Sequence, residues 1–103
     1  MTPMNSQVSL SEGRLRLGGV VHFENARDIC EAGLALIARS DGDLVVDLSN
    51  LESGGTVDVA ILLQWLKAAL HSKRQIRFEN ISDKLRSILR VSGLSDTFPI
   101  ANQ

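Results

Sequence analysis

The chain has 103 residues, of which 44% are apolar and 22% charged, so it fits one globular domain over residues 1–103 and is too short for two independent cores. Its 11 basic and 12 acidic residues leave a formal net charge of -1, which excludes a global positive field for holding nucleic acid. A single cysteine and an N-terminus with neither a basic start nor an apolar core argue against secretion and favour a cytoplasmic location.

The first third of the chain predicts a hairpin followed by a helix. Residues 7–10 and 14–17 each alternate polar and apolar side chains, and Ser11-Glu12-Gly13 supplies a turn between them. Apolar residues then recur at steps of three and four, which predicts a helix over about residues 25–39.

The middle of the chain predicts a buried strand and a long apolar helix. Residues 44–48 form a β-branched run without clean alternation, which is typical of a central strand covered on both faces. A glycine-rich loop follows, and residues 57–70 show helical spacing with Thr56 at the expected N-cap. That apolar segment is interrupted by polar residues and is shorter than the roughly 20 residues needed to cross a bilayer.

The last third predicts one more strand and a capped helix. Residues 75–79 alternate as a strand, and Ser82 is placed to cap a helix that buries Leu85, Ile88 and Leu89 and ends at Gly93. The order of elements predicts the α/β class, with one mixed β-sheet whose central strands are parallel and are packed by α-helices.

No group of side chains predicts a catalytic centre, a metal site or a cofactor. His22, Cys30 and His71 lie on three different predicted elements without ligand spacing, and Cys30 falls on an apolar stripe typical of a core residue. Gly54-Gly55-Thr56 lacks the spacing and the lysine of a phosphate-binding loop. Thr56 is therefore interpreted as a helix cap, with a regulatory phosphate acceptor as the compatible alternative.

The helix over residues 57–70 carries more apolar surface than one core contact requires. Val59, Leu62, Leu63, Leu66, Ala69 and Leu70 form the expected core-facing side. A second apolar stripe falls roughly opposite and comprises Val57, Ile61, Trp65 and Ala68. Tryptophan is enriched at the centre of protein interfaces, so this stripe predicts a docking surface for a partner, or for a second copy in a homodimer. The alternative is that a neighbouring helix or residues 98–100 cover it.

Several of these segments together resemble a STAS domain over nearly the whole chain. The segments are Val45-Val46-Asp47-Leu48-Ser49-Asn50-Leu51, the loop ending in Thr56, the helix through Leu70, Ile76-Arg77-Phe78 and Leu89 to Leu94. In that family the loop supplies a Ser or Thr at the start of the next helix, which is phosphorylated in some members. Thr56 matches this position, although Gly55 and Val57 replace the usual neighbours of the hydroxyl residue.

Within the family, the threonine and the stand-alone size are most similar to cytoplasmic STAS subunits of phospholipid ABC transporters that maintain outer-membrane lipid asymmetry. This resemblance implies a non-catalytic subunit that binds the ATPase and stabilises or regulates it, and that reaches the inner membrane only through its partner. It implies that the Thr56 end of the helix lies at or near the interface, and with the second apolar stripe the predicted binding surface comprises Gly54, Gly55, Thr56, Val57, Ile61, Trp65 and Ala68. The alternative is an anti-sigma factor antagonist that binds an anti-sigma factor kinase, against which the altered motif argues.

Overall fold

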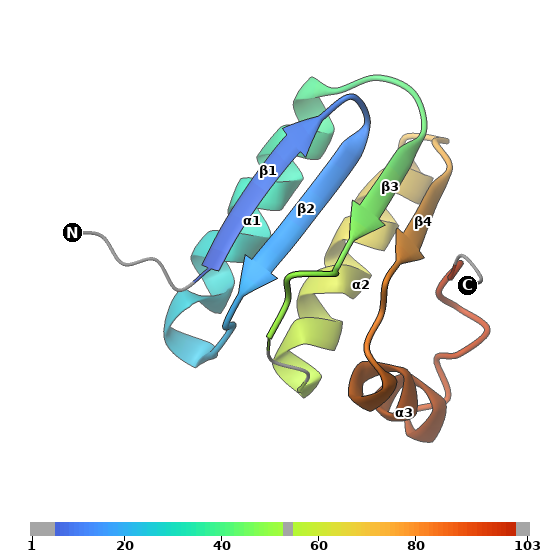
Figure 1. The fold of residues 1–103 in the computed structure, drawn as a ribbon. Helices are drawn as coiled ribbons and strands as arrows, with labels where there is room; N and C mark the ends of the chain where they lie inside the picture. The colour runs from blue at the N-terminus through green and yellow to red at the C-terminus, as the bar shows by residue number, and fades with distance from the viewer. Residues whose placement is uncertain (1–5, 53–54, 101–103) are drawn as a thin grey trace.

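The computed structural model describes residues 6–52 and 55–100, which form one four-stranded sheet and three helices (Figure 1). Every predicted strand and helix is present, and α1 begins two residues before its predicted start. The strands are β1 (Ser6–Ser11), β2 (Arg14–Gly19), β3 (Leu44–Asp47) and β4 (Ile76–Glu79). The helices are α1 (Phe23–Arg39), α2 (Thr56–His71) and α3 (Asp83–Val91).

The sheet has the mixed topology that the order of elements predicts. Its strands lie in the order β1-β2-β3-β4, with β1 antiparallel to β2 and with β2, β3 and β4 mutually parallel. The three parallel strands end at the same edge of the sheet, and each is followed by a helix. The starts of α1, α2 and α3 therefore gather at one end of the molecule, which we call the helix-start end (Figure 1).

The two faces of the sheet differ in chemistry because side chains alternate along each strand. Leu15, Val46 and Phe78 are fully buried in the core, and α1 and α2 lie on one side of the sheet (Figure 1). The opposite face carries a charged row across β2, β3 and β4, in which Arg14 Nη2 lies 2.8 Å from Glu79 Oε1. The sheet therefore buries one face, on the side where α1 and α2 lie (Figure 1), so the prediction that the strand at residues 44–48 is covered on both faces is wrong.

The centre of the second apolar stripe of α2 is buried, so the prediction that Ile61 and Trp65 face a partner is wrong, whereas Val57 and Ala68 are half-buried. Ile61 is 3% exposed and Trp65 is 0% exposed, because α1 packs along α2 on the side next to its sheet contact. The indole Nε1 of Trp65 donates a hydrogen bond to the Cys30 carbonyl oxygen at 3.1 Å. A helix enclosed between a sheet and a second helix is apolar on both sides, which explains the doubled stripe.

A glycine in α1 makes room for this tryptophan. Gly33 is buried against the indole ring, and a β-carbon added there would overlap the ring atoms. Leu70, which the spacing assigns to the core, is 58% exposed near the end of α2, so that assignment is wrong. Of the helices in the described part of the chain, none combines the length and apolarity that a bilayer crossing requires.

Helix α3 is capped at both ends by the residues that the sequence predicts. Ser82 Oγ accepts a hydrogen bond from the Leu85 amide at 3.1 Å, which satisfies one of the donors at the start of α3. Gly93 adopts a positive φ of 75°, and the amide of Leu94 donates to the Leu89 carbonyl oxygen at 2.8 Å. This pair of features is a Schellman motif, which fixes where α3 ends and the following segment begins.

Candidate functional site

Thr56 lies at the helix-start end as the first residue of α2, and its side chain is exposed. The prediction that Thr56 is the N-cap is wrong by one residue. Gly55 holds the cap position in an extended conformation, and its carbonyl oxygen accepts the Asp58 amide at 3.1 Å. Glycine is an acceptable N-cap, so the Thr56 side chain is not required to close the helix. The neighbouring Gly54 of the predicted surface lies outside the described residues.

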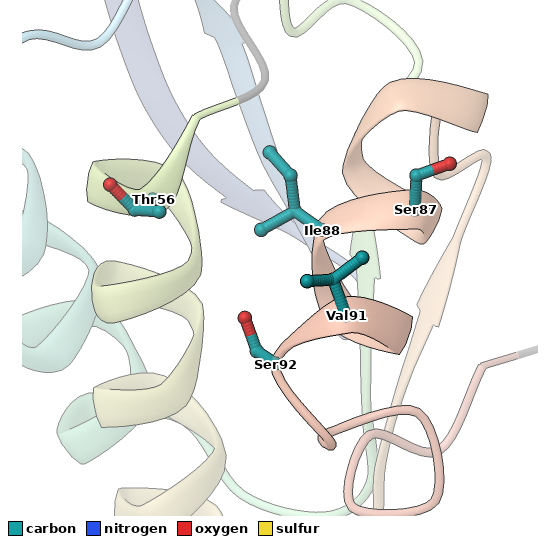
Figure 2. Close-up of a pocket in the computed structure, with 5 residues that line it drawn as sticks. All are labelled: Thr56, Ser87, Ile88, Val91 and Ser92. Atoms are coloured by element: carbon teal, nitrogen blue, oxygen red, sulfur yellow. The ribbon is translucent and has the colours of Figure 1, made fainter.

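An apolar groove of about 290 Å³ separates the start of α2 from α3, and we call it the α2–α3 groove. Figure 2 shows its lining residues, which are Thr56, Ser87, Ile88, Val91 and Ser92. Ile88 and Val91 give it an apolar surface, and Val91 is 86% exposed. The hydroxyl of Thr56 points away from α3 (Figure 2). An exposed valine beside an open apolar groove is a feature of interaction surfaces.

A second apolar groove, of about 310 Å³, lies on the other side of α2 against α1. Its lining residues are Phe23, Ala26, Arg27, Cys30, Val57, Ala60, Ile61 and Gln64. Phe23 is 86% exposed at the first position of α1. Burial and then the charge of Glu31 raise the pKa of the Cys30 thiol, which keeps it protonated and makes it a poor nucleophile. The first turn of α2 is thus flanked by apolar surface on both sides.

Asp47, at the end of β3, connects the two loops that carry α2 and α3. Its Oδ1 accepts hydrogen bonds from the Ser49 amide at 3.0 Å and from Asn80 Nδ2 at 2.9 Å. Its Oδ2 lies 3.6 Å from Arg14 Nη1. Burial by itself would raise the pKa of Asp47, but the hydrogen bonds from Asn80 and Ser49, together with the Arg14 charge, hold that pKa below its usual value. The charged carboxylate therefore holds the helix-start end together.

We expect Asp47→Asn to lower the free energy of unfolding by about 1–2 kcal/mol at neutral pH, because the amide weakens these charge-assisted contacts. A depressed folded-state pKa contributes stability above the ordinary value of 3.8, and this contribution is lost as the pH falls through the folded-state pKa. Urea unfolding of both proteins over a pH series should therefore show the difference shrinking in acid. A difference that stays constant down to strongly acidic pH would contradict the role of the charge.

The described residues contain no group of three or more His, Cys, Asp or Glu side chains that could hold a metal ion. His22 is the N-cap of α1, and its amide donates to Asn25 Oδ1 at 2.8 Å. Asp58 is buried in the first turn of α2, where the positive end of the helix dipole favours a carboxylate.

The structure brings together part of the predicted surface and adds two residues of α3 that were not predicted to belong to it. Gly55, Thr56 and Val57 lie together at the start of α2, whereas Ala68 lies three turns further along and is half-buried. Ile88, which the sequence predicts to be buried, is half-buried and lines the groove together with Val91. Val91 could have been found from the sequence, because it is an apolar residue outside the predicted core set of Leu85, Ile88 and Leu89 on a short amphipathic helix.

Comparison with known proteins connects this geometry to a family. A family model described as "Mlab, STAS domain" matches residues 4–100. A chain of the Acinetobacter MlaFEDB complex in an ATP-bound conformation shares 32% sequence identity, with a TM-score of 0.82 over 92% of this chain and 99% of that chain. A second ATP-bound conformation of that complex gives 31% identity and a TM-score of 0.77 over 92% and 100%.

An anti-sigma factor antagonist from Mycobacterium paratuberculosis shares 26% identity, with a TM-score of 0.70 over 95% of this chain and 85% of that chain. No curated relative matches by sequence. The resemblance first read from the Asp47-Leu48-Ser49 strand end and from Thr56 is confirmed by the match over residues 4–100. The chain belongs to the STAS domain family.

Proposed function

We propose that this protein is the STAS subunit of an Mla-type phospholipid ABC transporter, in which it docks on the ATPase subunit and stabilises or regulates it without catalysis of its own. The observation that carries this proposal is the 32% identity and TM-score of 0.82 to a chain of an ATP-bound MlaFEDB complex, over 99% of that chain. In this proposal the protein is cytoplasmic and reaches the inner membrane through its partner.

The helix-start end is the surface on which we place the ATPase. Support comes from the exposed Thr56, from the α2–α3 groove beside it and from Val91 at 86% exposure. Because Trp65 and Ile61 are buried, the side of α2 on which they lie is not available to a partner. We therefore place the candidate contact at the start of α2 and on α3. Gly55, Thr56 and Val57 are retained from the predicted set, and Ile88 and Val91 are added.

Co-expression with the ATPase and permease subunits of the transporter from the same organism tests this function. We expect the tagged chain to co-purify with the ATPase in a fixed stoichiometry, and we expect Val91→Asp to abolish recovery while its urea unfolding curve matches that of the wild type. The exposed position of Val91 is the reason that folding should survive. The matched control is Gln75→Asp at the opposite end of the molecule, where side-chain exposure is also high.

Two results would contradict the proposal. Failure of the wild-type chain to bind the ATPase, with capture of an anti-sigma factor kinase instead, would favour the antagonist function that the Mycobacterium paratuberculosis structure represents. Recovery of a homodimer alone would make the helix-start end a contact between copies of this chain.

A further inference from the structure

The rim of the α2–α3 groove is cationic. Helix α3 has the sequence DKLRSILRV, so its exposed side carries Lys84, Arg86 and Arg90 against the single acid Asp83. Within the described ranges, no ion pair joins these three cations to a carboxylate. Their charge is therefore available to a partner.

Two of these cations lie next to the apolar lining of the groove. Lys84 precedes Ile88 by four residues and Val91 by seven, so all three share one side of α3. Arg90 Nη2 donates to Oγ of the groove-lining Ser87 at 3.5 Å, which places the guanidinium beside the opening. The apolar surface and the positive charge thus belong to one continuous site.

The opposite wall of the groove is formed by the start of α2. Thr56 is the first residue of α2, and the start of a helix carries the positive end of the helix dipole. Asp58, the only acid in that first turn, is buried, and its carboxylate offsets part of this positive potential. A partner that enters the groove therefore meets an apolar lining and positive side chains from α3, with the first turn of α2 on the other wall.

We propose that the occupant of the α2–α3 groove is an acidic segment of the ATPase, which inserts an apolar side chain against Ile88 and Val91 and sets carboxylates against Lys84, Arg90 and the start of α2. This inference rests on the proposed function and adds the chemistry of the partner's contact. Charge complementarity of this kind speeds association and sets specificity, and it weakens with salt.

Titration of the purified ATPase with the full chain at low and at high salt tests the proposal. Lys84→Glu should weaken the affinity roughly tenfold at low salt, mainly through slower association, and the difference should narrow at high salt. The control Lys73→Glu makes the same change of charge at the far end of α2 and should leave the affinity within about twofold. Val91→Ser should weaken binding at both salt concentrations, because an apolar contact is not screened.

The outcomes separate this inference from the function on which it rests. If the wild-type chain binds the ATPase and Lys84→Glu has the same affinity as Lys73→Glu, the inference of an acidic partner segment is wrong, and the proposed function stands. If the wild-type chain does not bind the ATPase, both the proposed function and the inference of an acidic partner segment are wrong. Emission from Trp65, the single tryptophan and a fully buried one, verifies that each variant is folded.

Discussion

Trp65→Asp is expected to unfold the protein. The indole is 0% exposed between α1 and α2, and its Nε1 donates to the Cys30 carbonyl oxygen at 3.1 Å. Removing a buried tryptophan side chain costs about 3–5 kcal/mol, and an uncompensated buried carboxylate adds several more. Because a domain of this size is stable by only about 5–15 kcal/mol in total, most of that stability is lost. Far-UV circular dichroism and urea unfolding should show the loss directly.

The exposed neighbour Gln64 supplies the matched control for this variant. Gln64→Asp introduces the same side chain one position earlier in α2 and should change the free energy of unfolding by no more than about 0.5 kcal/mol. If Trp65 instead belonged to a docking surface, Trp65→Asp would lose partner binding while keeping the circular dichroism of the wild type. That result would contradict the packing of α1 on α2.

The strands and helices could be predicted from the sequence because each is determined by residues close together in the chain. Alternation identifies the hairpin, Ser82 and Gly93 mark the two ends of α3, and the β-branched run at residues 44–48 identifies the central strand. The family could be identified from the sequence for a related reason. The Asp47-Leu48-Ser49 strand end and the position of Thr56 depend on neighbours in the chain, and the match over residues 4–100 confirms them.

The sequence could not predict what covers the second apolar stripe of α2, because the cover is a contact between segments far apart in the sequence. An apolar stripe has the same pattern whether α1 or another protein covers it. The decisive residue is Gly33, whose missing side chain makes room for Trp65. A glycine in the middle of an apolar helix is the one sequence feature that could have indicated a close helix contact, since glycine is otherwise costly there.

Thr56→Glu is expected to weaken binding of the ATPase on the order of tenfold, and Thr56→Ala by less than about twofold. The glutamate places a negative charge at the start of α2, on the wall of the α2–α3 groove that Thr56 lines, where the proposed partner is itself acidic. Since Gly55 holds the N-cap, neither variant removes a cap, and an acid in the first turn of a helix is favourable. Both variants should therefore unfold in urea like the wild type.

Titration of the ATPase with both variants, and with the opposite-end control Gln75→Glu, measures this effect at low and at high salt. A loss of affinity specific to Thr56→Glu that shrinks as salt rises would mean that charge at the start of α2 controls docking, as a phosphate on the same hydroxyl would. Equal affinities for the glutamate and alanine variants would place the contact elsewhere on the molecule. In that case Thr56 would have neither a capping nor a switching role, and the hydroxyl would be an ordinary surface group at the start of α2.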